Sequence, residues 1–381
     1  MDFAWTEEQL AYKKGVIELA RNGLNEGILA RDRAGELSRE AWRTCAEFGI
    51  QGLPMPEAFG GSGADILTTM LTMEGLGYGC RDNGLIFAMN AQMWSVQMPI
   101  LHFGSEAQKA KYLPGMIRGD LIGAHGMSEP DSGSDAYSLR TRAERRDGGY
   151  LLNGSKTFVT NAPVADLALV FATVDRSKGM WGVTAFLVDR GTPGFRVGRD
   201  LDKLGLRTAP MAELIFEDCF LPEENRLGPV GAGAQIFSNS MEWERSCILA
   251  SHIGAMERQL EEAIVYVRER QQFGQPIGKF QSVANRIVDM QLRLETARLL
   301  LYKVAWLKKS GRPAAMEAAL AKLYLSESFV QSSLDAVRVR GGYGYMTEFE
   351  VERDLRDAIG GTLYSGTSDI QRNIVARLLG L

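Results

Sequence analysis

The sequence predicts an α+β multidomain protein, with an N-terminal helical domain over residues 1–118, a middle β domain over 119–226 and a C-terminal helical bundle over 227–381. Two observations predict this order. Apolar residues recur at helical spacing in the first and last parts of the chain, and short β-rich runs bounded by Gly, Asp, Asn and Pro fill the middle. A chain of 381 residues is long enough to form two or three such cores.

The N-terminal domain begins with a helix-start pattern. Thr6 and Gln9 have the spacing of a capping box, in which each residue satisfies a backbone N–H at the start of a helix. Two prolines and a Gly-rich cluster at 54–63 interrupt the helical pattern and predict a loop. Helical signals resume over 66–77 and again from Asn90 onward, so we expect further helices there.

The middle domain contains five short runs rich in β-branched and aromatic residues. They occupy 150–152, 157–160, 167–171, 183–188 and 214–216. Turn-forming residues separate them at short intervals. Closely spaced short strands of this kind predict a small antiparallel barrel or sandwich.

The C-terminal domain contains three long apolar stripes, over 249–267, 283–304 and 323–337. Within each stripe the apolar positions step by three and four residues, as on one face of a helix. The sequence Ser310-Gly311-Arg312-Pro313 separates the second stripe from the third. Long helices with one apolar face bury those faces against one another, so we expect an antiparallel four-helix bundle.

The composition and the sequence pattern argue against several functions and cellular locations. The net charge is −4 and the basic residues are scattered, so we expect no nucleic-acid partner. No apolar run approaches the ~18 residues that span a membrane, and the N-terminus does not resemble a targeting signal. Four separated cysteines without a CxxC motif predict reduced thiols in the cytoplasm. The three histidines lack metal-ligand spacing, so we expect no metal site.

Five motifs follow one another along the chain. They are Met127–Asp135, Asn153–Asn161, Arg270–Gly274 followed by Gln281, Gly341–Gly344 and Ser365–Gln371. In this order and spacing they resemble the acyl-CoA dehydrogenase superfamily over essentially the whole chain. The resemblance implies the acyl-CoA dehydrogenase fold, FAD as cofactor and α,β-dehydrogenation of an acyl thioester. It also implies a homotetramer whose subunits share their FAD contacts.

The resemblance assigns FAD contacts to residues of these motifs. Thr160 is expected near flavin N5, Ser128 near the pyrimidine edge, and Phe158, where the family usually has Trp, over the ring. Arg270 is expected to clamp the pyrophosphate from a neighbouring subunit, since guanidinium donates a planar fork of hydrogen bonds. The other expected cofactor contacts are His125, Met127, Ser134, Phe273, Gln281, Arg338, Gly341, Gly342, Thr367 and Asp369. Taken alone, the loop of the first motif also fits a plain Gly/Ser turn, and Arg270 also fits a solvated arginine at a helix end.

The usual base of the family is missing. Ser365 stands where many members have a glutamate directly before Gly-Thr, and a serine hydroxyl is too weak a base for the α proton. Met241–Arg245, expected to open the first bundle helix, resembles the isovaleryl-CoA dehydrogenase subgroup, whose base lies on this helix. We therefore expect Glu244 to be the base, with a pKa raised by an apolar pocket. The backbone N–H of Ser365 is expected to bind the thioester carbonyl.

The segment around Glu244 and the last motif together look most like the prolyl-carrier-protein dehydrogenases. This resemblance implies oxidation of a prolyl group on the phosphopantetheine of a carrier protein, to a pyrroline or pyrrole thioester. Ser134 and Arg245 are expected to contact the substrate, as are Met93 and Trp94, although helical spacing fits core positions for the last two equally well.

Other functions remain open from the sequence alone. One is a short- or branched-chain acyl-CoA dehydrogenase that passes electrons to an electron-transfer flavoprotein. Another is a flavin oxidase or monooxygenase that reacts with O2 on the same scaffold. A third is a non-catalytic flavoprotein, in which Glu244 is an ordinary exposed helix residue and the missing glutamate at position 365 marks lost chemistry.

Overall fold

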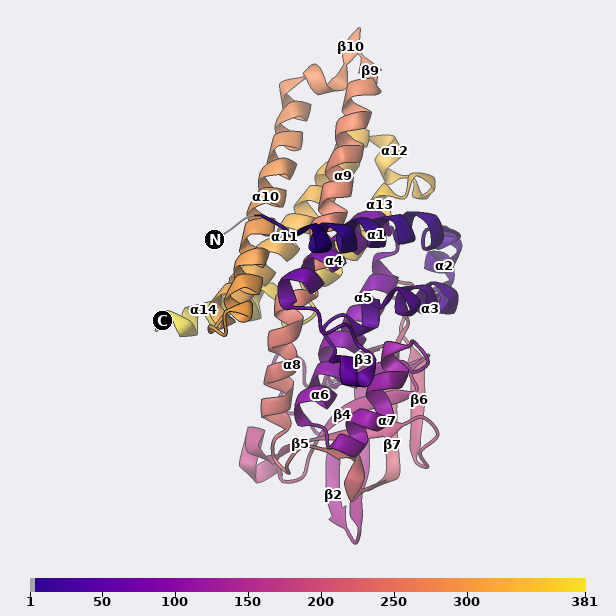
Figure 1. Ribbon diagram of the computed structural model, residues 1–381, viewed down its shortest axis with the longest axis vertical. Coiled ribbons are helices and arrows are strands. Elements are labelled where there is room, and N and C mark those ends of the chain that lie inside the picture. The colour runs from indigo at the N-terminus through magenta and orange to yellow at the C-terminus, as the bar shows by residue number, and fades with distance from the viewer. Residues whose placement is uncertain (1–3) are drawn as a thin grey trace.

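The computed structural model describes residues 4–381. Figure 1 shows an elongated molecule, with long C-terminal helices at one end, the β-sheet at the other and the N-terminal helices packed across the middle. The three regions follow the order that the sequence predicts.

The N-terminal region is helical, as predicted. Its helices are α1 (Glu7–Gly23), α2 (Ile28–Ala34), α3 (Arg39–Phe48), α4 (Ile66–Gly79), α5 (Asn83–Gln92), α6 (Met98–Phe103) and α7 (Glu106–Ile117). Thr6 and Gln9 form the predicted capping box at the start of α1. A π-helical turn, Met93–Gln97, joins α5 to α6. The helical segment expected from Asn90 begins earlier, because the Asp82 side chain caps α5 by accepting the Leu85 N–H at 2.9 Å.

The middle region forms one sheet. Its strands are β1 (Gly123–Gly126), β2 (Arg142–Arg146), β3 (Gly149–Thr160), β4 (Leu167–Thr173), β5 (Val183–Asp189), β6 (Phe195–Asp200), β7 (Met211–Pro222) and β8 (Arg226–Leu227). The order is β6-β7-β3-β2-β4-β5-β8, with β1 beside β4. Most pairings are antiparallel, as predicted, but β1 and β2 each pair with β4 in parallel. The runs at 150–152 and 157–160 belong to the single strand β3, which remains paired with β7 through two register shifts.

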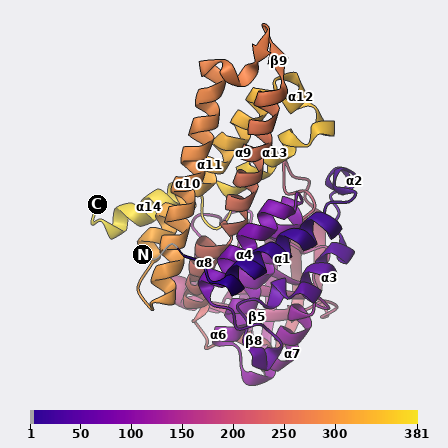
Figure 2. The same cartoon turned by 45° about the horizontal axis from the view of Figure 1, so that its top comes forward.

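The C-terminal region contains the predicted long helices. They are α8 (Gly233–Cys247), α9 (Ala250–Glu269), α10 (Gln281–Lys309) and α11 (Ala315–Arg340), followed by α12 (Gly342–Tyr345), α13 (Val351–Gly361) and α14 (Ser368–Leu378). The three apolar stripes coincide with α9, α10 and α11. The short strands β9 (Gln271–Gln272) and β10 (Gln275–Pro276) form a hairpin at the tip between α9 and α10. Figure 2 shows α14 pointing away from these helices.

One expectation about Glu244 is wrong. The residue does not open the first bundle helix, because α8 already begins at Gly233 and Glu244 lies in its last turn. The helical period then restarts at Ala250, after two turn residues. The Gly- and Pro-rich stretch 228–232 ends directly before α8, so the helix can begin there.

Close backbone packing joins the N-terminal helices to the bundle. A Cβ atom at Gly77 of α4 would lie 1.9 Å from the Ser251 carbonyl oxygen, and one at Gly254 of α9 would lie 1.9 Å from the Glu74 oxygen. Only glycine permits this approach of α4 and α9. A continuous apolar core extends through both regions, and a second apolar core lies within the sheet.

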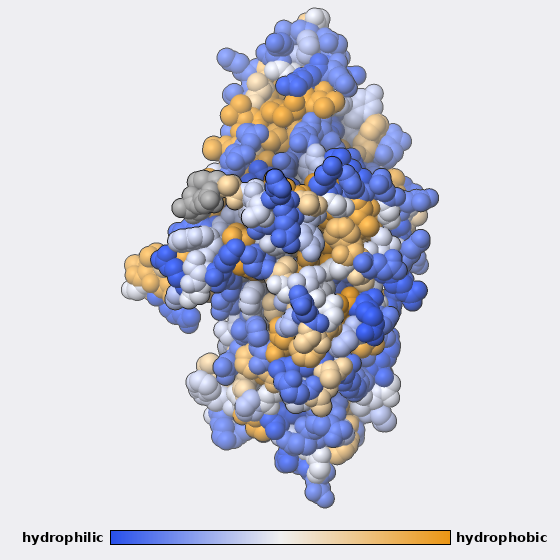
Figure 3. Space-filling view, in the orientation of Figure 1, coloured by the Kyte–Doolittle hydropathy of each residue, from blue (hydrophilic) through white to orange (hydrophobic). Residues whose placement is uncertain are grey.

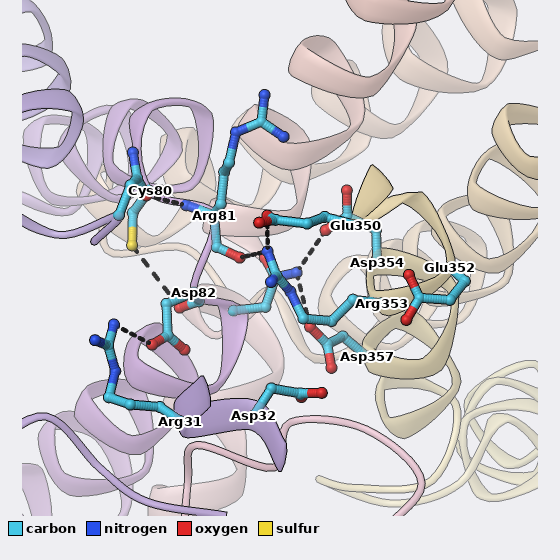
Figure 4. Close-up of polar contacts among 12 residues, drawn as sticks. Arg31, Asp32, Cys80, Arg81, Asp82, Glu350, Glu352, Arg353, Asp354 and Asp357 are labelled. Carbon is cyan, nitrogen blue, oxygen red and sulfur yellow. Dashed lines mark hydrogen bonds and ion pairs between the residues drawn. The ribbon is translucent and has the colours of Figure 1, made fainter. Parts of the chain in front are cut away.

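A buried polar network connects α13 to the other two regions, and Figure 4 shows part of it. Asp354 accepts hydrogen bonds from Arg258 of α9 at 3.2 Å and from Asn83 of α5 at 2.8 Å. Asp357 accepts the backbone N–H of Leu206, from the connection between β6 and β7, at 2.6 Å. The network therefore fixes the helix that leads directly into the loop at Ser365.

The surface carries one prominent apolar area at the bundle end. Val265 of α9 and Val288 and Leu292 of α10 are each more than half exposed. Figure 3 shows apolar side chains gathered over this end of the molecule. In the part of the chain from residue 4 onward, no helix is both long enough and apolar enough to cross a membrane. The four cysteines are buried and form no disulfide.

Candidate active site

Glu244 is a buried carboxylate held by two serine hydroxyls. Only 8% of the residue is exposed. Ser365 Oγ donates a hydrogen bond to Glu244 Oε2 at 2.9 Å, and Ser95 Oγ donates to Oε1. These three residues come from α8, the loop before α14 and the π-helical turn, so the packing of three distant segments creates the site.

The surroundings of Glu244 affect its pKa in opposite directions. Burial raises the pKa, whereas the two serine hydroxyls and the positive charges of Arg245 and Lys322 lower it, and the net result is a raised pKa. Glu242 differs, because its side chain is 48% exposed and pairs with Lys308 at 2.7 Å. Glu244 therefore has the burial and the raised pKa expected of a general base, whereas Glu242 is half-exposed and paired.

The loop at Ser365 has an unusual backbone conformation. Ser365 has φ +55° and Gly366 has φ +87°, in the left-handed region that is unfavourable for serine. Side chains secure its two carbonyl oxygens. Arg245 Nε donates to the Ser365 oxygen at 3.1 Å, Lys322 Nζ donates to the Gly366 oxygen at 2.8 Å, and Gln371 Nε2 donates to both. Strained residues held by several contacts are typical of functional sites.

These contacts leave the Ser365 backbone N–H without a hydrogen-bond acceptor among residues 4–381. This N–H therefore has no acceptor of its own within the described part of the chain. Burial and the nearby Arg245 charge lower the pKa of Lys322 to about 8, so most Lys322 side chains remain charged at neutral pH.

The first two motifs meet at the end of β3. The Thr157 N–H donates to the Ser128 carbonyl oxygen at 2.9 Å. The hydroxyls of Ser128 and Thr160 have no hydrogen-bond partner in the part of the chain that the structure describes. Phe158 has φ +56° and is 67% exposed. Two unpaired hydroxyls beside an exposed aromatic ring fit a flavin, whose ring edge needs hydrogen bonds and whose face needs apolar cover.

A buried ion pair locks these motifs together. Lys156 Nζ lies 2.7 Å from Glu129 Oε1 and also donates to the Met127 carbonyl oxygen at 3.1 Å. Glu129 in turn accepts the Thr141 N–H at 3.0 Å. Burial lowers the pKa of Lys156 to about 8. Because both charges are paired and hydrogen-bonded, the pair can fix the loop that carries Ser128.

Other predicted site residues lie near this region. Met93 and Trp94 are fully buried, and Trp94 stacks on Trp243 with the ring centroids 6.2 Å apart. The His125 ring contacts two phenylalanines, and its Nε2 atom has no partner among the described residues. Burial lowers the pKa of His125 to about 4, so the ring is neutral at neutral pH. Ser134 is exposed on the loop of the first motif.

The remaining predicted FAD contacts form a separate group. Arg270 and Phe273 lie at the tip of the α9–α10 hairpin and Gln281 at the start of α10, at the opposite end of the molecule from the sheet (Figure 1). The Arg270 guanidinium lies 5.7 Å from the centre of the Tyr343 ring, next to Gly341 and Gly342. One chain therefore does not bring this group together with Ser128 and Thr160.

Nearby residues of the same chain contact three more predicted site residues, Thr367, Asp369 and Arg338. Thr367 caps α14 by accepting the Ile370 N–H at 3.2 Å. Asp369 is exposed and pairs with Arg372 at 2.9 Å. Arg338 lies 3.5 Å from Asp335 on the same helix. None of these contacts by itself indicates a cofactor.

Sequence reasoning missed several residues of the site. Ser95 belongs to no motif, and Lys322 directly precedes the third apolar stripe. Gln371, Glu129 and Lys156 belong to the motifs, but the motifs alone assign them no partner. Membership of a motif marks these three residues as candidates, but their partners become evident only in the folded chain.

A β region with unpaired hydroxyls suited to a flavin, between two helical regions that hold a buried carboxylate, is typical of a flavin-dependent enzyme. Three models described as acyl-CoA dehydrogenase N-terminal, middle and C-terminal domains match residues 6–120, 124–219 and 231–380. The chain belongs to the acyl-CoA dehydrogenase family.

Individual relatives cover the whole chain. The chain is 42% identical to an L-prolyl-[peptidyl-carrier protein] dehydrogenase of Pseudomonas fluorescens, over 100% of both sequences. The solved structure of the prolyl acyl carrier protein oxidase AnaB is 50% identical, with a TM-score of 0.98, covering 99% of this chain and 100% of that one. The structure of PigA with FAD and proline is 42% identical, with a TM-score of 0.97 and full coverage of both chains.

Proposed function

We propose that this chain is an FAD-dependent dehydrogenase that oxidises the Cα–Cβ bond of a prolyl group carried as a thioester on the phosphopantetheine of a carrier protein. The observation that carries the proposal is the buried Glu244 carboxylate, held by Ser95 and Ser365 beside an unpaired backbone N–H. The full-length similarity to enzymes named for prolyl carrier proteins supports the choice of substrate.

The residues of the site have distinct roles in this reaction. The Glu244 carboxylate takes the α proton and becomes a carboxylic acid, while the β hydrogen leaves with its electron pair. FAD, when bound, would supply the acceptor for that hydride. The Ser365 N–H binds the thioester carbonyl oxygen and stabilises the negative charge that develops there. Arg245 and Lys322 hold the loop that positions this N–H.

Two groups of residues hold the cofactor. Thr160, Ser128 and Phe158 bind and cover the flavin ring. His125 and Met127, on β1 and directly after it, belong to the same group. The second group, around Arg270 and Gly341–Gly342, lies at the other end of the chain, so it serves the FAD of a neighbouring subunit. The exposed apolar residues of α9 and α10 support a homotetramer in which such sharing occurs.

The competing function is a short- or branched-chain acyl-CoA dehydrogenase with the same base. To distinguish the two, purified holoenzyme is mixed without oxygen with prolyl carrier protein or with isovaleryl-CoA, and flavin absorbance is followed. We expect the prolyl carrier protein to bleach the flavin and isovaleryl-CoA to leave it oxidised. Bleaching by isovaleryl-CoA alone would overturn the prolyl assignment.

The electron acceptor is tested separately. After anaerobic reduction by the prolyl substrate, the reduced enzyme is exposed to O2 or to an oxidised electron-transfer flavoprotein. Rapid reoxidation by O2 with release of hydrogen peroxide identifies an oxidase. Reoxidation only by the flavoprotein identifies a dehydrogenase, which is the outcome we expect.

A further inference from the structure

An exposed apolar patch lies where the connection between β4 and β5 meets the start of α8. The connecting segment η4 (Arg176–Gly182) carries Met180, which is 40% exposed, and Trp181, which is 68% exposed. Val230, in the turn before α8, is 52% exposed. We call these three residues, with the exposed Arg176 and Lys178, the Trp181 patch.

Backbone contacts hold the two halves of the patch together. The Gly231 N–H donates to Thr184 Oγ1 at 3.0 Å. A Cβ atom at Gly231 would lie 2.6 Å from the Trp181 carbonyl oxygen, and Gly231 has φ +82°. Only glycine allows the turn to approach η4 so closely. Trp181 and Val230 are therefore presented together on a fixed surface.

The patch is positively charged at its rim. Lys178 has one carboxylate partner, Asp175, at 3.6 Å, and Arg176 has none among residues 4–381. Asp175 is itself engaged in accepting the Ser177 N–H at 3.0 Å. Exposed tryptophan and arginine are enriched in the few residues that dominate protein interfaces. The composition thus fits the docking of a partner that brings negative charge.

Helix α8 connects the patch to the proposed base. Glu244 lies eleven residues after Gly233, the first residue of α8, which corresponds to about 17 Å along the helix axis. Ala234, Phe237, Met241 and Glu244 follow one another at helical spacing and share a face of the helix.

The loop of the first motif lies along this face. The Tyr137 hydroxyl donates to the Ala234 carbonyl oxygen at 3.5 Å, and the Tyr137 ring meets the Phe237 ring edge-on, with centroids 6.1 Å apart. Ser134 is exposed on the same loop. The ring and hydroxyl of Tyr137 therefore border the face of α8 between the patch and Glu244.

The length of this path matches a phosphopantetheine arm. The arm has about as many chain atoms as four to five amino-acid residues, so it extends roughly 16 Å. An arm rooted at the Trp181 patch would therefore place its thioester at Glu244. The phosphodiester that joins the arm to its carrier serine is negatively charged and would lie beside Arg176 and Lys178.

We propose that the Trp181 patch is the docking surface for the carrier protein that delivers the substrate. Trp181 and Met180 pack against the carrier, and Arg176 and Lys178 face its phosphodiester and the acidic side chains around it. The arm follows α8 to Glu244. This inference rests on the proposed function and adds to it the surface that recognises the partner.

The test compares two substrates that differ only in the carrier. Wild-type holoenzyme and variants are assayed with prolyl carrier protein and with a free prolyl-pantetheine thioester. We expect Trp181→Ala to raise KM for the carrier-bound substrate about tenfold or more, with kcat and the KM for prolyl-pantetheine unchanged. Phe220→Ala is the matched control, because Phe220 is 42% exposed on β7, towards the other edge of the sheet.

A second variant tests the charged rim. The double substitution Arg176→Glu and Lys178→Glu should lower kcat/KM for prolyl carrier protein, weaken its dependence on salt and leave prolyl-pantetheine turnover unchanged. Bound flavin and Tm verify that each variant is folded.

The outcomes separate this inference from the proposed function. Unchanged KM for prolyl carrier protein in both variants would overturn the docking surface, and so would equal losses on both substrates. Wild-type enzyme that oxidises neither substrate would instead overturn the proposed function itself.

Discussion

The Oγ atom of Ser365 lies 2.9 Å from Oε2 of Glu244 and donates a hydrogen bond to it. A glutamate at 365 would place a second carboxylate beside Glu244, and two carboxylates so close cannot both ionise readily. With Glu244 as the proposed base, position 365 therefore has to supply a neutral partner. The serine hydroxyl meets that requirement, because it donates a hydrogen bond to the ionised form.

The raised pKa of Glu244 gives the reaction a defined pH dependence. A protonated carboxyl cannot accept the α proton, so the rate of flavin reduction should rise with pH as Glu244 ionises. Ser95→Ala removes a hydroxyl that favours the ionised form, which raises the pKa and moves this acid limb to higher pH. The measurement is the pH profile of anaerobic flavin reduction in a stopped-flow instrument.

The control for Ser95 is Ser246→Ala. Ser246 is also buried, but its hydroxyl donates to the Glu242 carbonyl oxygen at 2.6 Å and does not contact Glu244. The acid limb of the pH profile of Ser246→Ala should coincide with that of the wild type. If the acid limb of Ser95→Ala also coincides with that of the wild type, Ser95 does not affect the pKa of the base.

The loop at Ser365 should depend on its lysine anchor. Lys322→Met removes the hydrogen bond to the Gly366 carbonyl oxygen and lets the Ser365 N–H move away from the substrate carbonyl. Because small misplacements of catalytic groups are costly, we expect kcat to fall about 10- to 100-fold with FAD retained. Lys303→Met is the control, since Lys303 is exposed and, among residues 4–381, pairs only with Glu317. Wild-type kcat in Lys322→Met would contradict the anchoring role.

The buried network at α13 should contribute strongly to stability. Asp354→Ala leaves Arg258 buried without its carboxylate partner, and we expect the free energy of unfolding to fall by about 3–5 kcal/mol. The comparison is Glu18→Ala, which breaks an exposed pair with Lys14. This substitution should change the free energy of unfolding by about 1 kcal/mol or less. Urea denaturation of the holoenzymes measures both, and equal effects would refute the structural role of the network.

Removing the cofactor should lower the thermal stability. A ligand that binds only the folded state stabilises it in proportion to the logarithm of its concentration over Kd. The Tm of deflavinated protein should therefore lie several degrees below that of the holoenzyme and recover when FAD is added. Thr160→Ala should diminish this recovery at limiting FAD. A Tm that does not rise when FAD is added would argue against the proposed flavin site.

Much of the fold could be predicted from sequence because it depends on local periodicity. The stripes of α9, α10 and α11 are each set by apolar residues three and four apart. Strand pairing was harder, since the parallel contacts of β4 with β1 and β2 join residues far apart in the chain. The break between α8 and α9 was missed because the apolar spacing continues across it.

The site was only partly predictable for the same reason. Glu244 and Ser365 could be paired because two motifs change together relative to the family pattern. Ser95 had no such signal, since Met93, Trp94 and their neighbours read as ordinary core helix, and the π-helical turn that aims Ser95 at Glu244 is a tertiary feature. The Lys156–Glu129 pair likewise forms only when two motifs fold together.

Anaerobic flavin reduction by prolyl carrier protein in Glu244→Gln tests the central claim most directly. The amide keeps the shape of the side chain but cannot take the α proton, so the variant should retain FAD and reduce it at least 100-fold more slowly than the wild type. Glu242→Gln, on the same helix but half-exposed and paired with Lys308, should react like the wild type. Flavin reduction in Glu244→Gln at the wild-type rate would show that another group is the base.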